Sequence, residues 1–119
     1  MLRRAWFPHT ETGMIIGTIR IIPSARQRAA VVELLQRVQG PVRTQPGCAG
    51  CCVFEETGIE PAVVLVERWA SEAALEIHIR SDDFRLVLGA LELSSEVPEV
   101  SFEHVSRTEG LELIERVRM

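Results

Sequence analysis

Residues 63–84 read VVLVERWASEAALEIHIRSDDF, which is the pattern of a buried strand followed directly by a short helix. The continuous aliphatic run at residues 63–66 is typical of a strand that is covered on both faces. Because side chains alternate along a strand, Leu65, Glu67 and Trp69 are expected to share one face. This unit brings an acid and an indole to the end of a buried strand, and the rest of the chain is interpreted around it.

The helix that follows has a clear start and a clear inner face. Ser71 is a residue type that caps helix N-termini, and the sequence predicts a helix from Glu72 to about Arg80. Three- and four-residue spacing gives an inward-facing set of Ala74, Leu75, His78 and Ile79. His78 is therefore expected to point toward the sheet.

Three features of this stretch resemble the antibiotic biosynthesis monooxygenase family. They are the ERW at the strand end, the helical His78 nine residues after Trp69, and the SDDF at residues 81–84. The resemblance extends over roughly residues 14–107 and implies a small ferredoxin-like α+β chain that dimerises into a shared α/β-barrel. The family includes cofactor-free quinol and anthrone monooxygenases, haem-degrading enzymes and a signal-molecule isomerase, so the resemblance implies a fold and leaves several reactions open.

The composition is typical of one globular domain and excludes several functions. The chain has 119 residues, of which 46% are hydrophobic and 25% are charged, and this argues against disorder. A net charge of -4, with acids interleaved among the arginines, argues against nucleic acid as a partner. All 13 basic residues are Arg, which excludes Schiff-base and pyridoxal chemistry at a lysine.

Targeting and boundary signals are few. No apolar run approaches the ~18 residues of a membrane helix, and no signal-peptide core follows Arg3 and Arg4. We therefore expect a cytoplasmic protein with no membrane partner. A poorly ordered arm is expected at residues 1–13, the family-like domain at residues 14–108, and an amphipathic C-terminal helix at residues 109–119.

The order of strands and helices predicts the architecture. Besides the strand at residues 62–69, strands are expected at residues 14–22, at residues 48–56 and from Pro98 onward, with Gly17 marking a close approach. The resulting order β-α-β-β-α-α-β-α is compatible with a ferredoxin-like antiparallel sheet that has helices on one face. An apolar face left bare on the other side must be buried by association, so we expect a homodimer.

The expected helix ends depend on local signals. Ser24 is expected to cap the first helix, and Gly40 and Pro41 should end or kink it. The family pattern instead carries this helix on toward Gln45. The caps expected for the helix after His78 are Ser81 or Asp82.

His78 is the leading candidate for a catalytic residue. The resemblance implies a pocket between the sheet and the helices, into which the helical His reaches. A His with apolar neighbours can act as a general base on a phenolic hydroxyl. The alternative is a structural His that bonds to a backbone carbonyl.

Trp69 and Glu67 are the next candidates, as substrate-binding residues. The indole could wall the pocket and stack on a flat aromatic ligand, while the carboxylate could orient a base. Alternatively, Trp69 is a core residue and Glu67 is half of a structural ion pair with Arg20 or Arg68. For Glu67 the sequence favours the ion pair.

Three further residues are expected to line the pocket. Phe84 belongs to the helix after His78, and Phe102 and His104 share one face of the last strand. His104 is the weakest of the three, because a His beside Phe102 and Val100 is more often packed or at a rim than catalytic.

The cysteines form a CAGCC motif that resembles a metal or redox site. On a regular strand Cys51 and Cys52 point to opposite faces, and only Cys48 and Cys52 align. Zinc needs four convergent ligands, and the sequence has no second Cys cluster or paired His to complete a set. We interpret the three as small buried hydrophobic residues and expect no metal site.

The family's haem-degrading branch differs from this chain at its ligand positions. That branch has a helix Trp where this chain has His78, and its axial His corresponds to Leu88 here. The sequence also contains no Asn for the first-strand position of that pattern. No haem, and no other cofactor, is expected.

These expectations lead to one function and two alternatives. The first is a cofactor-independent monooxygenase that oxidises a phenolic or quinol substrate with dioxygen, with His78 removing the phenolic proton. The second is an isomerase that uses the same His to shuttle a proton on a small carbonyl compound. The third is a non-catalytic dimeric module that binds a small aromatic metabolite.

Overall fold

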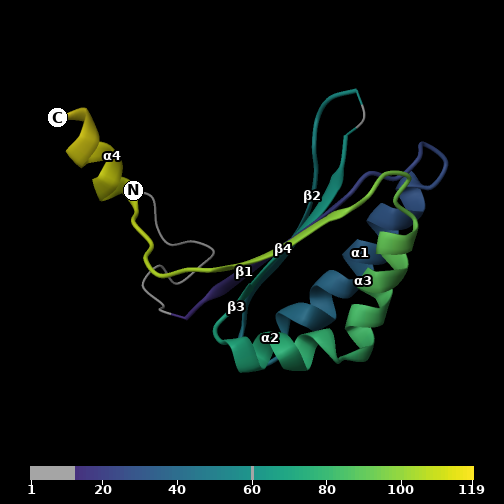
Figure 1. Cartoon of the computed structure of the whole chain (residues 1–119), viewed down its shortest axis with the longest axis horizontal. Coiled ribbons are helices and arrows are strands. Elements are labelled where there is room, and N and C mark those ends of the chain that lie inside the picture. Colours follow the sequence, from purple (N-terminus) through teal and green to yellow (C-terminus); the bar gives the residue numbers. More distant parts are fainter. Residues whose placement is uncertain (1–12, 60) are drawn as a thin grey trace.

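The fold is a four-stranded antiparallel sheet with three helices packed on one face (Figure 1). The computed structural model describes residues 13–59 and 61–119. The strands are β1 (Ile15–Ile21), β2 (Cys48–Glu55), β3 (Val63–Trp69) and β4 (Glu99–His104). The helices are α1 (Arg28–Arg43), α2 (Glu72–Ile79), α3 (Asp82–Glu92) and α4 (Leu111–Arg118). The predicted ferredoxin-like α+β class is confirmed, and the arm expected at residues 1–13 lies outside the described residues except for Gly13.

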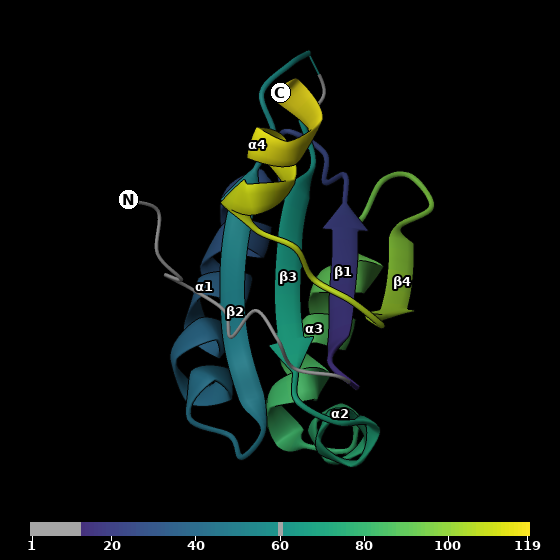
Figure 2. The same ribbon diagram turned by 90° about the vertical axis from the view of Figure 1, so that its left-hand side faces the viewer.

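The strand order is β2-β3-β1-β4, with α1 and α3 behind the sheet and α4 on the viewer's side in Figure 2. Residues in register across neighbouring strands point to the same face. One such row, on the helix-facing side, consists of Cys51, Glu67, Gly17 and Phe102. The two central strands, β3 and β1, therefore carry the acid and a glycine side by side.

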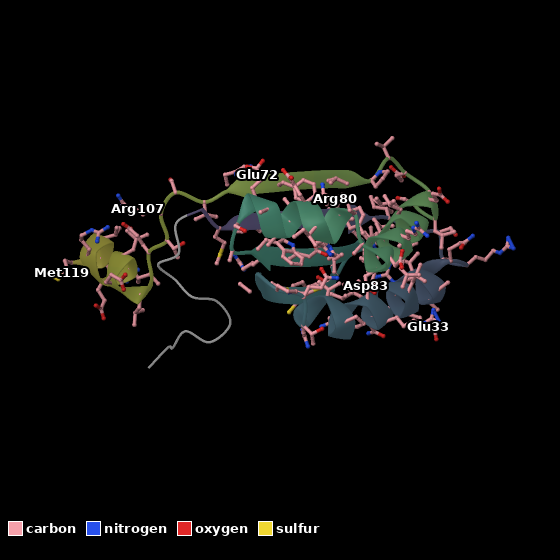
Figure 3. All side chains as sticks on the ribbon, turned by 90° about the horizontal axis from the view of Figure 1, so that it is seen from below. Glu33, Glu72, Arg80, Asp83, Arg107 and Met119 are labelled. Atoms are coloured by element: carbon pink, nitrogen blue, oxygen red, sulfur yellow. The ribbon has the colours of Figure 1, made fainter. Side chains whose placement is uncertain are left out.

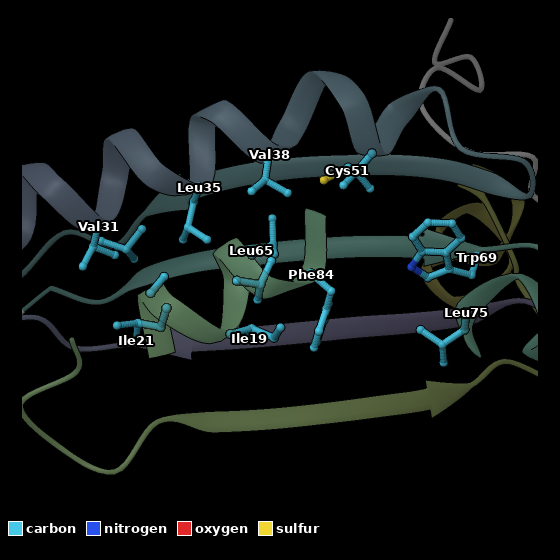
Figure 4. Packing of buried hydrophobic residues seen from close by; sticks show 14 of the residues in the cluster. Ile19, Ile21, Val31, Leu35, Val38, Cys51, Leu65, Trp69, Leu75 and Phe84 are labelled. Atoms are coloured by element: carbon cyan, nitrogen blue, oxygen red, sulfur yellow. The ribbon is translucent and has the colours of Figure 1, made fainter. Parts of the chain in front are cut away.

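The core lies between the sheet and α1, α2 and α3. Figure 4 shows Leu35 and Val38 of α1 facing Leu65 of β3, with Phe84 of α3 and Trp69 at the strand end. Alternate residues of β1 and β3 are buried, which is the pattern of strands with one face on a core. The other face of β3 is only half-buried, so the expected cover on both faces is absent within the described part of this single chain.

The predicted start of α1 is wrong, and its end agrees with the family pattern and not with an end at Gly40 and Pro41. The helix begins at Arg28, not after Ser24, because residues 24–27 form a separate turn in which the Gln27 amide donates to the Ser24 carbonyl at 3.0 Å. Pro41 lies inside α1 and does not end it. Val38 and Val42 are both buried, so packing against the core holds the turn that contains this proline.

The caps of the paired short helices are confirmed. The Ser71 hydroxyl oxygen accepts from the Ala74 amide at 3.1 Å, and that of Ser81 accepts from the Phe84 amide at 3.3 Å. The inner face of α2 is narrower than predicted, because Ile79 is 39% exposed while His78 is fully buried.

The predicted C-terminal helix is present as α4, which projects away from the sheet (Figures 1 and 3). All of its residues are exposed. Within the described residues, no helix is long and apolar enough to cross a membrane.

Candidate functional site

A buried acid and imidazole meet between the sheet and α2. Oε2 of Glu67 lies 2.9 Å from Nε2 of His78, and both side chains are within 2% of complete burial. Burying a carboxylate is costly unless a charged or hydrogen-bonding partner compensates, and His78 supplies that partner. The expected ion pair of Glu67 with Arg20 or Arg68 is wrong, because strand alternation turns both arginines to the opposite face, where Arg20 pairs with Glu56 and Glu99.

Two aromatic side chains enclose the imidazole. The Trp69 indole stacks on His78 with ring centroids 4.5 Å apart, and the Phe84 ring meets it edge-on at 5.2 Å. Nε1–H of Trp69 donates to Oε1 of Glu67 at 3.2 Å. Trp69 is thus a core residue, as the alternative interpretation held, and it also contacts the buried pair directly.

The other nitrogen of His78 is bonded by a residue that the sequence did not identify for this role. Nδ1 lies 3.1 Å from Oε1 of Gln45, and Nε2 of Gln45 donates to Oδ2 of Asp83 at 3.0 Å. Gln45 follows α1, and Asp83 lies in the first turn of α3, where a helix N-terminus favours a negative charge. The backbone carbonyl expected as an alternative partner of His78 is replaced by these side chains.

Only part of this hydrogen-bonded arrangement can be predicted from the sequence. Asp83 belongs to the SDDF motif, and its position at the start of a helix is predicted from that motif. Gln45 lies 33 positions from His78 in the chain, so no local pattern could connect the two. Only tertiary packing, of α1 against α3 and of α3 against α2, brings them together.

Phe102 of β4 lies in the same sheet row as Glu67, with Gly17 between them. A Cβ atom placed on Gly17 would lie 3.0 Å from Cε1 of Phe102 and 3.9 Å from Oε1 of Glu67. The ring of Phe102 therefore occupies the notch that the glycine leaves, next to the carboxyl group. The close approach predicted at Gly17 is confirmed.

His104 lies apart from this cluster. It is exposed at the end of β4, where it is in register with Ile15, and Ile15 is in register with Trp69. One strand thus separates His104 from Trp69. Its predicted place at a pocket rim remains a prediction.

The cysteine motif contains a β-bulge between Cys48 and Gly50, which corrects the expected alignment. Cys48 is in register with Trp69 and Cys51 with Glu67, so these two cysteines share the inner face and Cys52 points outward. Burial, with Glu67 nearby, raises the pKa of the Cys51 thiol, and burial also raises the pKa of Cys48. Both are neutral packing residues at neutral pH, and the described residues contain no group of three or more His, Cys, Asp or Glu side chains that could hold a metal ion.

Comparison with protein families gives a match over more than half of the chain. The family model described as antibiotic biosynthesis monooxygenase matches residues 14–88. A Synechocystis protein, described as uncharacterized protein sll1783, is 23% identical over 99 residues, which are 82% of this chain. The match spans 66% of that relative, so the chain corresponds to slightly less than two thirds of its length.

Solved structures share the fold at low sequence identity. The Mycobacterium tuberculosis protein Rv0793 is 23% identical, with a TM-score of 0.70 over 82% of this chain and 98% of that one. A structure described as an antibiotic biosynthesis monooxygenase is 21% identical, with a TM-score of 0.68 over 76% of this chain and 97% of its own. At these identities the likeness shows the fold alone.

Proposed function

Because the chain belongs to the antibiotic biosynthesis monooxygenase family, we propose that it is a cofactor-independent monooxygenase that oxidises a phenolic or quinol substrate with dioxygen. The observation that carries this proposal is the buried contact of Glu67 and His78 at 2.9 Å, enclosed by aromatic side chains. A titratable pair in such surroundings is typical of a proton-transfer site.

The substrate site in this proposal lies beside the pair, under Phe102. The rings of Phe84, Phe102 and Trp69 would stack on a flat aromatic substrate. His104, on the same face of the sheet as Phe102, would lie at the rim. Because Glu67 and His78 are almost fully buried, the substrate must displace at least one side chain, and half-buried Phe102 on an edge strand is the one with room to move.

The proposed reaction starts with loss of the phenolic proton to the buried pair. The electron-rich anion then reduces dioxygen directly, and the radical pair recombines while the surrounding apolar side chains exclude water. One oxygen atom is added to a ring carbon and the other leaves as water, so a phenol and one dioxygen give a quinone and one water. The substrate supplies all the electrons, and the reaction needs no external reductant.

The proposal includes a cytoplasmic homodimer. The sheet face opposite the helices presents half-buried apolar side chains from β1 and β3, among them Ile16, Val64 and Val66. A second copy of the same face would cover them and close a barrel. Three cysteines that form no disulfide are compatible with a reducing compartment.

Oxygen consumption tests the proposed function. Wild-type protein with a panel of hydroquinones, naphthols and anthrones is expected to consume oxygen faster than the uncatalysed autoxidation. His78→Gln is expected to slow this consumption, whereas His104→Gln serves as the matched control with a smaller effect. If every compound is left at its background rate while aromatic ligands still bind, the non-catalytic binding module is correct instead.

A further inference from the structure

The hydrogen bonds around His78 have a direction, and Asp83 sets it. A carboxylate can only accept, so the Gln45 atom that faces Oδ2 of Asp83 at 3.0 Å must be the amide nitrogen. The amide oxygen of Gln45 therefore faces Nδ1 of His78 at 3.1 Å, and that nitrogen must carry a proton to donate.

The contact on the other side of the ring then needs a second proton. With Nδ1 protonated, Nε2 of His78 and Oε2 of Glu67 would face each other with lone pairs alone at 2.9 Å unless one of them holds a proton. Glu67 and His78 therefore share one proton, either as carboxylate and imidazolium or as carboxylic acid and imidazole. Both ring nitrogens are occupied, so His78 has no free lone pair for a substrate.

We propose that Gln45 and Asp83 are positioning residues that hold the proton on Nδ1 of His78, and that the atom which receives the substrate's proton is Oε1 of Glu67, not a nitrogen of His78. The assignment of Oε1 rests on the proposed function, whereas the positioning of His78 does not.

The proton transfer balances on these atoms. The substrate O–H bond breaks and an O–H bond forms at Oε1 of Glu67, while Oε2 continues to accept from Nε2–H of His78. The substrate becomes an anion and His78 remains as imidazolium, so the buried site stays neutral. Nε1–H of Trp69, which lies 3.2 Å from Oε1, can still donate to this oxygen after protonation.

Oε1 is also the oxygen that faces the only notch in this row of the sheet. It lies on the Gly17 side, where Phe102 fills the space that a Cβ atom would take. Displacement of the Phe102 ring would bring a hydroxyl group beside Oε1, whereas Oε2 stays behind it against His78. The geometry thus separates an oxygen for the substrate from an oxygen for the imidazole.

Nitrogen NMR of the His78 ring tests the positioning role without any substrate. In the wild type at neutral pH, Nδ1 is expected to carry a slowly exchanging proton. Asp83→Asn can donate as well as accept, so Gln45 can turn over and a mixture of ring tautomers is expected. The double variant Gln45→Glu/Asp83→Asn restores an acceptor beside Nδ1 with a donor behind it, and the wild-type signal should return.

Two results would overturn the positioning role. One is an unprotonated Nδ1 in the wild type. The other is an Asp83→Asn spectrum identical to that of the wild type. The direction of the hydrogen bonds from His78 through Gln45 would then not depend on Asp83. Thermal melting of each variant identifies loss of fold, and Gln45→Met, which keeps length and removes both bonds, is a second variant that should lose the Nδ1 signal.

Turnover of a phenol that the protein oxidises tests the role of Oε1. Removal of a general base costs about 10²–10⁴-fold in rate, and Glu67→Gln is expected to lower kcat by this range with little change in KM. His78→Gln can still bond to both neighbours and should lower kcat less. If His78→Gln lowers kcat as much as Glu67→Gln or more, His78 is the general base and the assignment to Oε1 is wrong. If no phenol is oxidised, the proposed function and the Oε1 assignment are both wrong. The NMR experiment still tests the positioning role of Gln45 and Asp83 independently.

Discussion

Gly17 shows how one missing methyl group shapes the site. Its neighbours in the sheet row are Glu67 and Phe102, and a Cβ atom would stand 3.0 Å from the Phe102 ring. That separation is too short for carbon atoms, which pack at about 3.5–4.0 Å. A side chain at this position must therefore push Phe102 away from the carboxyl group.

Gly17→Ala is expected to keep the fold and lower kcat about tenfold or more, because the methyl group stands between the substrate and Oε1 of Glu67. The measurement is steady-state oxygen uptake together with thermal melting. Gly17→Ala/Phe102→Leu, in which the smaller side chain makes room, should recover stability but not the rate. Unchanged turnover in Gly17→Ala would place the substrate elsewhere.

Cys51 is expected to behave as an inert core residue. Burial, with Glu67 nearby, raises the pKa of its thiol, so iodoacetamide should modify it at pH 8 only after unfolding in urea. A raised pKa in the folded state also means that its stabilising effect is lost as pH rises above about 9, where the unfolded thiol ionises. Cys51→Val should flatten this alkaline loss of stability. Rapid labelling of native Cys51 would contradict its packing.

The residues of the site differ in how readily the sequence reveals them. Glu67 and Trp69 follow from strand alternation, and His78 follows from helical spacing, so their convergence was predictable. Gln45 was not, because its partners lie 33 and 38 positions away and are joined to it only by tertiary packing. The predicted partner of Glu67 was wrong, because strand alternation turns Arg20 and Arg68 to the opposite face of the sheet.

The turn between α1 and β2 holds α2 in place. Gly47 has φ of +83°, and a Cβ atom there would lie 2.5 Å from Cβ of Ala74. Its carbonyl accepts from the Ala70 amide at 2.8 Å, just before α2 begins. The glycine therefore allows the turn to lie against the helix that carries His78.

Gly47→Ala is expected to destabilise the protein by about 1–3 kcal/mol, since the backbone is strained and α2 must shift. The matched control is Gly40→Ala in α1, where a Cβ atom meets nothing within 4 Å and helix propensity should add about 0.5–1 kcal/mol. Urea unfolding measures both. Equal stabilities for the two variants would contradict this account of the turn.

Arg20 links three segments of the outer sheet face. From β1 it bonds Glu56 through two contacts of 2.8 Å and reaches Glu99 of β4 at 3.2 Å. The hydrogen bond to Arg20 lowers the pKa of Glu56 below its ordinary value. A carboxyl group with a lowered pKa stabilises the fold above its unfolded pKa and loses that effect as the pH falls through the folded pKa.

Acid unfolding should therefore begin below about pH 4.5, the ordinary value for this carboxyl group. Arg20→Gln is expected to lower stability at pH 7 more than at pH 3, which flattens the acid side of the profile. Arg85→Gln, at an exposed contact of 3.7 Å with Asp82, is the control with little effect at either pH. A uniform loss at both pH values would show that Arg20 acts by packing alone.

The predictions for strands and helices succeeded where burial and local caps agree. The central strands β1 and β3 are rich in aliphatic residues, and Ser71 and Ser81 cap their helices as expected. The predicted start of α1 was wrong, because residues 24–27 form a separate turn before the helix begins. The bulge in β2 was not predicted, because the run of small residues around it contains no local signal for a bulge.

Two apolar surfaces are left uncovered by the residues that the structure describes. One is the outer sheet face, and the other is the apolar side of α4, where Leu111, Ile114 and Val117 are all exposed. The projection of α4 beyond the sheet (Figure 1) places both surfaces where a second subunit could reach them. In the proposed homodimer, the second subunit covers the sheet face.

Sedimentation is expected to give a dimer at micromolar concentration. Val66→Arg, in the middle of the outer face, should give a monomer, because it buries a charge in the interface. Ile77→Arg on the exposed side of α2 is the control and should stay dimeric. A wild-type monomer would contradict the barrel.

The most direct test of the central claim, that the buried pair takes a phenolic proton, is the absorption spectrum of a bound phenol without oxygen turnover. With 4-nitrophenol at a pH where the free compound is neutral, the wild-type protein should bind it as the coloured phenolate. Glu67→Gln should bind it as the neutral phenol. A phenol that stays neutral in the wild-type protein would contradict the account.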